Sequence, residues 1–347
     1  DAGELQYAGP LLALVHPTGQ PLYVTLGYLW SHMVRVGSMA YRMNLLAAFS
    51  AAIACAIFVW ALYRLYGVPW VALASGLTLG LGSAFWGQAV LADKYAFSAL
   101  FASLVTGLAL NWDKARERPS GDKWLYALAA AYGISLLHHR SMFMFAPGLV
   151  LMILLRERSA LWIKRRRTLI CLALALLPML IVYPLYLPWV QARHLSPILW
   201  QPDSALGWLD WWLERHVISG EVLVFDSLGA FVEHLGIYWR TLVSDYTPFV
   251  LLVAAVGFLS LAWRAPASLA FLLLTYVLVG MLAANYRGNE RQFTYYLPSF
   301  VVLLYAYGAG LAALWEAVRS RLREKRQRVT AFGVVGVALI LLVPVAQ

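Results

Sequence analysis

Two carboxylates stand three positions apart at the start of the chain, in the sequence DAGE. On a turn of helix, Asp1 and Glu4 would face the same way. Such a pair could supply a general base, or it could hold a divalent cation whose remaining positions are filled by water. The same spacing also occurs on solvated surfaces, so the chemistry depends on which other polar residues join the pair.

The other polar side chains that could take part in chemistry lie in four motifs. They are His16 in HPTGQP; Asp93, Lys94 and Tyr95 in LADKYAF; His138, His139 and Arg140 in LLHHRSM; and Arg287, Glu290, Arg291 and Tyr295 in NYRGNERQFTYYLPS. An arginine at a membrane boundary suits a phosphate, because its forked donors bind two oxygens at once. Each motif also has a plainer interpretation: a polar turn with an anchoring tyrosine, an arginine that snorkels to headgroups, or an internal salt bridge.

A zinc site is not favoured by these residues. His138 and His139 are adjacent, so on a regular helix they cannot both point at one metal, and the chain has no HxxxH or HxH spacing. A divalent cation at the two acids remains an option that no motif indicates. The GxSxG, P-loop and GxGxxG motifs of soluble enzymes do not support any function for this sequence.

The composition is that of a polytopic membrane protein. Of 347 residues, 62% are hydrophobic and 13% are charged, where a soluble domain carries about 25% charged residues. The net charge of +10 does not indicate nucleic-acid binding, because the basic residues lie in loops between apolar runs and not on one soluble face. Cys55 and Cys171 lie inside apolar runs, where a thiol behaves as a small hydrophobe.

Apolar runs predict an all-α bundle of about ten transmembrane helices. We expect spans at Met43 to Tyr66, Pro69 to Leu91, Ala96 to Trp112, Trp124 to Leu137, Met142 to Leu155, Thr168 to Tyr186, Thr247 to Trp263, Pro266 to Asn285, Tyr296 to Ala317 and Val329 to Ala346. The fourth and fifth spans are short, which predicts that one of them is tilted, broken or only partly inserted.

The basic residues predict the orientation of this bundle. If the first span runs inward, 18 of the 27 Lys and Arg residues fall in the inner loops, as the positive-inside rule requires. All the polar motifs named above then fall on the outer, extracytoplasmic side. A polar cluster of this kind in an apolar protein is by default a hypothesis for a functional site.

We expect a single transmembrane domain over residues 1–347 with two long outer segments. The first, residues 1–42, contains an apolar run from Leu22 to Val36 that predicts a helix lying on the membrane surface. The second, residues 187–246, carries Trp200 and five other tryptophans among mixed charges, which predicts short surface helices with an aromatic face.

Together these motifs resemble glycosyltransferase family 117, also described as domain of unknown function 2723. The resemblance rests on DAGE, HPTGQPLY, RMNLLAAFSA, FWGQAVLADKYAF, GISLLHHRSMFMFAPG, PILWQPDSALGWLDW and RQFTYYLPS, and it runs from Asp1 to about Leu311. The family includes the animal protein O-mannosyltransferase that acts on plexins, and bacterial relatives.

The resemblance implies a GT-C membrane glycosyltransferase that uses a polyprenyl-phosphate sugar at an extracytoplasmic site. It implies that Asp1, in the first outer loop, is the catalytic base, with Glu4 beside it. It also implies one further helix ahead of Asp1. The residues expected to bind substrate are His16, Asp93, Tyr95, His138, His139, Arg140, Trp200, Arg287, Arg291 and Tyr295.

Two motifs depart from the family pattern. Where the family has Glu-Val-Tyr, this chain has Asp93, Lys94 and Tyr95, so the acid is shorter and a lysine is added. The family's Asn-Trp-Gly-Asp-Pro is replaced by LWQPD, which begins at Leu199. The identities of the sugar and of the acceptor therefore stay open.

The function expected is transfer of a sugar, with mannose as the first candidate, to an acceptor hydroxyl. Ser or Thr of a protein is the favoured acceptor, and a glycan is the alternative. The expected partners are the lipid-linked donor, that acceptor, membrane lipids and other membrane subunits, in a bacterial plasma membrane or the endoplasmic reticulum. A lipid-linked sugar transporter and a non-catalytic subunit of a larger complex are the rival interpretations.

Overall fold

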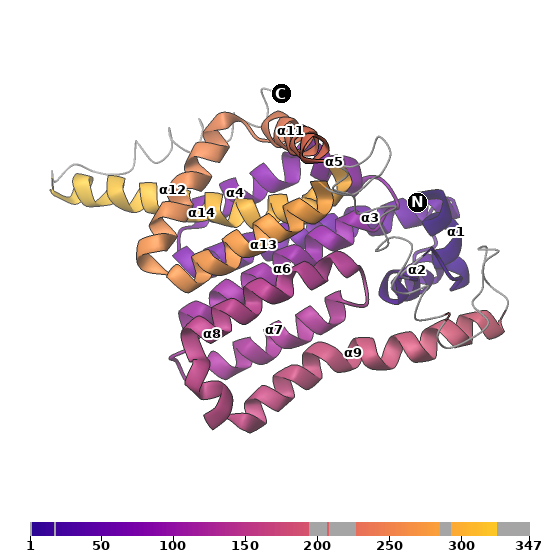
Figure 1. The fold of residues 1–347 in the computed structure, drawn as a ribbon. Coiled ribbons are helices and arrows are strands. Elements are labelled where there is room, and N and C mark those ends of the chain that lie inside the picture. Colours follow the sequence, from indigo (N-terminus) through magenta and orange to yellow (C-terminus); the bar gives the residue numbers. More distant parts are fainter. Residues whose placement is uncertain (1, 17–18, 194–206, 208–226, 285–292, 325–347) are drawn as a thin grey trace.

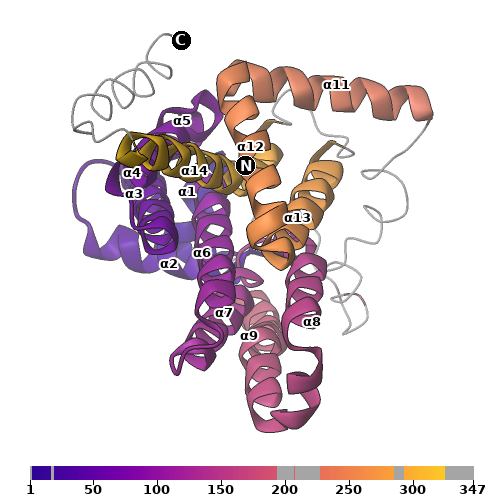
Figure 2. The same cartoon turned by 90° about the vertical axis from the view of Figure 1, so that its left-hand side faces the viewer.

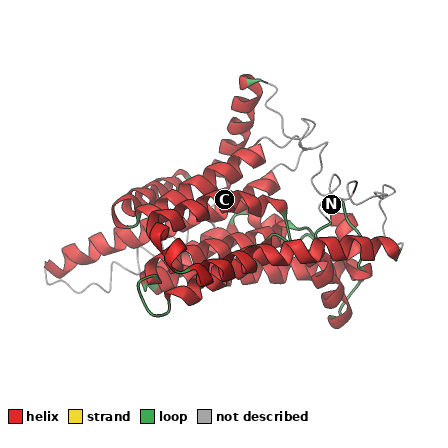
Figure 3. Ribbon diagram, turned by 60° about the horizontal axis from the view of Figure 1, so that its bottom comes forward, coloured by secondary structure: helices red, strands yellow, loops and turns green. Residues whose placement is uncertain are grey.

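The computed structural model is a bundle of helices (Figure 1). It describes the chain except for residues 1, 17–18, 194–206, 208–226, 285–292 and 325–347. Asp1, Trp200, Arg287, Arg291 and the predicted span Val329 to Ala346 therefore lie outside the described residues. No strand occurs among the residues that are described, and Figure 3 shows helices connected by loops.

The helices follow one another along the chain in antiparallel and bent pairs. They are α1 (Ala2–Leu11), α2 (Pro21–Met33), α3 (Met39–Tyr66), α4 (Pro69–Leu81), α5 (Ser83–Ala89), α6 (Tyr95–Ala115), α7 (Gly121–Ser135), the 3₁₀ helix η1 (Arg140–Phe145), α8 (Ala146–Ile163), α9 (Arg165–Ala192), α11 (Leu228–Asp245), α12 (Pro248–Arg264), α13 (Pro266–Ala284) and α14 (Phe293–Glu324). Each predicted span within the described residues thus coincides with a helix or a pair of helices.

The prediction of an integral membrane protein is confirmed. Within the described residues, five helices are long and apolar enough to cross a bilayer, or up to seven spans if each of two bent helix pairs counts as one. The helix α7 has only 15 residues, fewer than the roughly 20 that a straight span needs. The count of about ten spans therefore stays a prediction.

The span predicted from Pro69 to Leu91 is bent, because the helix breaks at Gly82. Helices α4 and α5 meet there at 70°, and Gly82 has the extended backbone angles φ −59° and ψ 133°. A Cβ on Gly82 would lie 2.9 Å from the hydroxyl of Tyr246. Glycine therefore permits the close contact between this bend and the second bend of the bundle, where α11 and α12 meet at 104°.

A carboxylate from the second bend caps the helix that follows the first. Asp245 accepts a hydrogen bond from the backbone N–H of Ala84 at 3.0 Å and another from the hydroxyl of Ser83. These groups belong to the first turn of α5, whose N–H groups have no partners within the helix. The two bends are therefore stabilised together.

Replacing Asp245 with alanine is expected to lower stability by about 1–2 kcal/mol, the usual contribution of a helix N-cap. The fall should appear as a lower midpoint of thermal unfolding in detergent. Asp245→Asn, which keeps one acceptor oxygen, should lose less. A midpoint unchanged in Asp245→Ala would contradict the capping role.

The centre of the bundle is formed by α6 and α14, which lie between the other helices (Figure 2). Their most apolar 18-residue windows are 89% and 83% buried, whereas that of α9 is only 6% buried. Helix α14 packs closely against α12 through Gly257 and Gly310, and small residues of this kind let membrane helices approach each other. Helix α9 exposes its apolar side chains and continues to Ala192, six residues beyond the predicted end of its span.

Candidate active site

The first helix, α1, is tied to the bundle by one asparagine. Asn44, on α3, accepts hydrogen bonds through its Oδ1 from the Gln6 side chain and from the backbone N–H of Ala92, both at 3.0 Å. The first contact holds α1, and the second holds the turn that leads into Asp93 and Lys94. Two motifs that are about 90 residues apart in sequence are thereby fixed to the same end of α3.

At this end of the bundle, His16 joins an acid to a lysine. Its Nδ1 lies 2.5 Å from Glu4 Oε2, and its backbone N–H donates to Glu4 Oε1 at 2.7 Å. On the other side of the ring, its Nε2 lies 2.9 Å from Lys94 Nζ. An imidazole that donates from Nδ1 can accept at Nε2, so the three side chains form a chain of hydrogen bonds from carboxylate to ammonium.

The Glu4 carboxylate is held in its charged form. Burial by itself would raise its pKa, but the hydrogen bonds and charge of His16, together with Lys94, bring the pKa below its ordinary value of 4.5. Because both carboxylate oxygens contact His16, the arrangement suits Glu4 to hold the histidine in position.

Asp93 and Lys94 are both buried where α6 begins, with 5% and 2% of their surfaces exposed. The Asp93 carboxylate accepts from the backbone N–H of Lys94 at 2.7 Å. The Lys94 ammonium also lies 5.5 Å from the centre of the Tyr95 ring, a favourable distance for a cation–π contact. A lysine buried this deeply requires such anionic, polar and aromatic neighbours.

The two histidines of the HHR motif have different surroundings. His138 is fully buried, and its Nε2 lies 3.1 Å from the hydroxyl of Ser98 and 3.0 Å from the carbonyl oxygen of Lys94. The Nδ1 of His139 accepts from the hydroxyl of Ser141 at 2.8 Å and from the backbone N–H of the same residue at 3.2 Å, so His139 caps η1. Enclosure by protein and the charge of nearby Lys94 hold the pKa of His139 well below its ordinary value.

Stability is expected to fall as pH drops below 6.5 because His138 is buried in its neutral form. Burial lowers its pKa from 6.5 to about 3, while the unfolded chain takes up the proton near 6.5. The contribution is complete above pH 6.5 and is lost as pH falls toward 3, with about 2 kcal/mol lost by pH 5. Thermal midpoints measured between pH 5 and 8 would check this.

The matched control for that measurement is His32, which is exposed on α2. The variant His138→Gln should flatten the pH dependence, and His32→Gln should leave it unchanged. Equal slopes for the wild-type protein and His138→Gln would contradict the assignment.

Three aromatic rings come together beside the lysine. Tyr95 packs edge-on against Tyr295 with ring centres 5.2 Å apart, and His139 lies 6.4 Å from Tyr95 and 6.5 Å from Tyr295. Arg140, half-buried, follows as the first residue of η1. Residues from α6, α14 and the turn after α7 therefore share one end of the bundle.

Helix α9 supports the polar turns from outside. Tyr183, Leu187 and Val190 of α9 are buried against Leu14 and Leu137, which precede His16 and His138 closely in sequence. Apolar packing on this side keeps the two histidine-bearing turns in place.

The described site residues predicted from sequence lie at one end of the bundle: Glu4, His16, Asp93, Tyr95, His138, His139, Arg140 and Tyr295. Lys94 belongs to the LADKYAF motif but was not among the residues predicted to bind substrate. The signal that could have found it is a lysine at the very start of an apolar span, where burial requires a partner. Among the described residues, no three His, Cys, Asp or Glu side chains could hold a metal ion together.

Comparison with solved structures identifies the class of fold. The chain is similar to ArnT from Cupriavidus metallidurans bound to undecaprenyl phosphate, with a TM-score of 0.60 and 16% identity over 90% of this chain and 54% of that one. It is also similar to the oligosaccharyltransferase AglB from Archaeoglobus fulgidus, solved with an inhibitory peptide and a dolichol phosphate, with a TM-score of 0.58 and 14% identity over 99% of this chain and 50% of that one. The fold is therefore that of the GT-C membrane proteins.

Within this class, the first half of the chain is O-mannosyltransferase-like. Residues 1–162 match the family model described as the protein O-mannosyl-transferase TMEM260 N-terminal domain. Protein O-mannosyl-transferase TMEM260 of Mus musculus is 26% identical over 156 residues, which are 45% of this chain and 22% of that protein. The Dictyostelium discoideum protein of the same name is 22% identical over 175 residues, 47% of this chain and 21% of its own length. The chain thus spans about a fifth of the curated relatives that it matches.

Proposed function

We propose that this chain is the membrane-embedded catalytic part of an inverting glycosyltransferase. It moves a sugar, with mannose the first candidate, from a polyprenyl-phosphate donor to the hydroxyl of Ser or Thr on the extracytoplasmic side of a bacterial plasma membrane or the endoplasmic reticulum. The similarity to O-mannosyltransferases supports the reaction class. Undecaprenyl phosphate and dolichol phosphate in the solved structures of similar fold support the donor class.

The observation that carries the proposal is the hydrogen-bonded chain from Glu4 through His16 to the buried Lys94, at the predicted outer end of α6. A cation buried at a membrane boundary is suited to bind a lipid phosphate, because the surrounding apolar protein strengthens the attraction. In ArnT, which has a similar fold, the bound lipid is a polyprenyl phosphate.

The reaction follows from these groups. The acceptor oxygen attacks the anomeric carbon of the sugar and forms the new glycosidic bond. The bond between that carbon and the phosphate oxygen breaks, and the electron pair leaves with the polyprenyl phosphate. Lys94 and Arg140 stabilise the developing negative charge, together with Arg287 and Arg291 from the segment outside the described residues. A single displacement inverts the anomeric centre.

Asp1 accepts the acceptor's proton in this proposal. It directly precedes α1, three residues ahead of Glu4. Glu4 and Asp93 orient the substrates and the cations, and His16 connects Glu4 to Lys94. The walls of the site are formed by the remaining residues predicted to bind substrate: Tyr95, His138, His139, Tyr295 and Trp200. The first and second outer segments, residues 1–42 and 187–246, bring the acceptor to it.

The test is the variant Asp1→Asn in the full-length protein. Transfer of mannose from polyprenyl-phosphate mannose to a Ser/Thr peptide should fall by about 100-fold or more, since a general base contributes roughly that much. The matched control is Glu117→Gln, which changes an acid with an 82% exposed side chain at the other end of the bundle. Full activity in Asp1→Asn would remove the proposed base.

Assays on the same full-length protein distinguish a glycosyltransferase from the two rival functions, a transporter and a non-catalytic subunit. A transporter would move a lipid-linked sugar across a vesicle membrane without forming a glycosidic bond. A non-catalytic subunit would purify with a stoichiometric partner and show no turnover by itself.

A further inference from the structure

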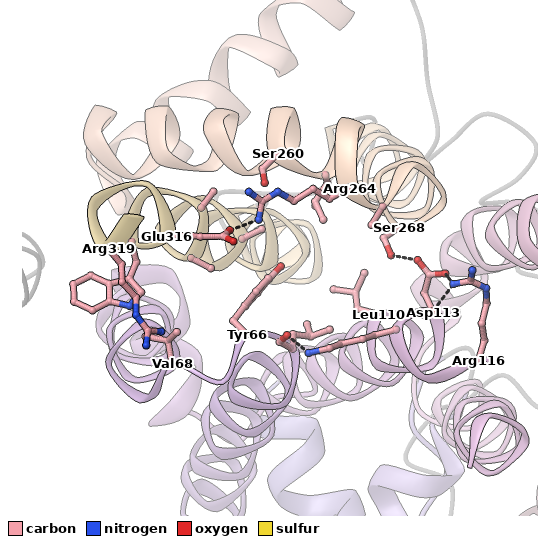
Figure 4. Close-up of a pocket in the computed structure, with 18 of the residues that line it drawn as sticks. Tyr66, Val68, Leu110, Asp113, Arg116, Ser260, Arg264, Ser268, Glu316 and Arg319 are labelled. Atoms are coloured by element: carbon pink, nitrogen blue, oxygen red, sulfur yellow. Dashed lines mark hydrogen bonds and ion pairs between the residues drawn. The ribbon is translucent and has the colours of Figure 1, made fainter. Parts of the chain in front are cut away.

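A polar cavity of about 470 Å³ opens at the end of the bundle opposite Lys94. It lies among the ends of α3, α6, α12 and α13 and the last turns of α14 (Figure 4). Helix α6 connects the two ends with 21 residues, a length of about 31 Å. The distribution of basic residues predicts that this end is cytoplasmic, so the cavity is distinct from the proposed catalytic site.

The cavity lining has an excess of positive charge. It contains five basic residues and two acidic ones: Lys114, Arg116, Arg156, Arg264 and Arg319, with Asp113 and Glu316. The formal charge of the lining is therefore +3. This excess of cations around one cavity favours an anionic ligand.

Asp113 organises one wall of the cavity. Its carboxylate is 4% exposed and lies 2.7 Å from Arg156 Nε and 3.3 Å from Arg116 Nη1. It also accepts from the hydroxyl of Ser268 at 2.6 Å. Arg116 also pairs with the exposed Glu117 at 2.5 Å, so both arginines of this wall have acid partners.

Two further cations have no acid partner among the described residues. The Lys114 ammonium donates to the carbonyl oxygens of Arg64, at 3.1 Å, and of Leu65. Arg319 forms no ion pair with any described residue, and Figure 4 shows it beside Val68 on the wall opposite Asp113. On the remaining side, the exposed Arg264 pairs with Glu316.

The rest of the lining is apolar and adjoins the surface of the bundle. Val68, Leu261 and Trp315 line the cavity, and Trp263 on the neighbouring surface is 82% exposed. Tryptophan and arginine together are typical of the membrane–water boundary. A ligand of this cavity would therefore meet cations on one side and an apolar surface on the other.

We propose that this cavity binds the phosphate headgroup of an anionic phospholipid from the inner leaflet. Lys114 and Arg319, the cations of the lining without an acid partner among the described residues, bind the phosphate oxygens, while Arg116 and Arg156 stay paired with their acids on the opposite wall. The apolar lining and the exposed Trp263 accommodate the first part of the acyl chains. A mixed lining of this kind favours a lipid over a free phosphate ion.

The experiment measures lipid binding to the delipidated full-length protein by native mass spectrometry. Phosphatidylglycerol should bind at one site at least about tenfold more tightly than phosphatidylcholine, because only the former has a net negative charge. The double variant K114Q/R319Q should weaken phosphatidylglycerol binding about tenfold, because both cations are exposed and the loss of two exposed charge pairs has an effect of this size. The single variant Arg319→Gln changes an exposed residue, so it tests the site without a change in the core.

The matched control is R165Q/R166Q, which removes two exposed basic residues outside the cavity. It should change binding by less than about twofold if the site is local. Equal weakening by both double variants, or no weakening by Arg319→Gln and K114Q/R319Q, would overturn the proposal. A further measurement compares the thermal midpoint with inorganic phosphate and with phosphatidylglycerol at equal concentration. An equal rise with both would also overturn the proposal, since the ligand would then be a soluble phosphate.

Discussion

Replacing Lys94 with methionine is expected to lower the rate of sugar transfer by about 100- to 1,000-fold, the usual cost of removing one preorganised donor that stabilises transition-state charge. Methionine keeps most of the length of the side chain and removes only its charge and donors. Lys94 is 2% exposed, and its ammonium lies 2.9 Å from His16 Nε2. In the proposed mechanism, water therefore cannot easily replace the ammonium that faces the leaving phosphate.

The measurement separates binding from chemistry. If Lys94 stabilises charge that develops in the transition state, kcat falls while KM for the lipid donor changes little. Lys94→Arg, which keeps the charge in a larger group, should retain more activity than Lys94→Met. Transfer at the wild-type rate by Lys94→Met would exclude this role.

The control for this variant is Lys123→Met, a change at an exposed lysine near the start of α7. It should leave both kcat and KM unchanged. Lys94→Met leaves the buried Asp93 without the neighbouring positive charge, which could destabilise the fold. The thermal midpoint of the variant, compared with that of the wild-type protein, measures this effect. A loss of activity in a protein that keeps its midpoint is the result expected for a direct role.

Adding a single methyl group at Gly310 is expected to disrupt the bundle. The Cβ of Gly310→Ala would lie 1.9 Å from the carbonyl oxygen of Val253 and 3.0 Å from the backbone nitrogen of Gly257. These are backbone atoms of α12, so the contact is relieved only if α12 and α14 move apart. We expect a loss of at least about 3 kcal/mol, the upper end of the usual cost of overpacking, with little folded protein recovered.

The same substitution is expected to stabilise the protein at a glycine that has room for a methyl group. At Gly236, on α11, the nearest atom to an added Cβ is Arg240 Nη1 at 3.7 Å, an ordinary contact. Gly236→Ala should therefore raise stability by about 0.5–1 kcal/mol through the helix preference of alanine. Size-exclusion profiles and thermal midpoints in detergent would compare the two variants. If both alanines had the same effect, the close packing of α12 and α14 would not explain the loss.

The sequence by itself determined the class of protein and the positions of most helices. A long apolar run satisfies its backbone hydrogen bonds in a membrane as a helix, and each predicted span among the described residues coincides with a helix or a pair of helices. Loop positions between these spans also predicted which residues share an end of the bundle. Glu4, His16, His138 and Tyr295 were predicted together because successive spans alternate in direction.

The tertiary structure decided the bends and the partners within the site. The break at Gly82 depends on Asp245 and Tyr246, more than 160 residues later, so no local pattern around Pro69 to Leu91 could predict it. The contact between Lys94 and His16 likewise joins positions that are 78 residues apart. Hydropathy predicts whether a segment prefers lipid, but the neighbours of a buried lysine or glycine depend on how whole helices pack. That packing brings the Lys94 ammonium to His16.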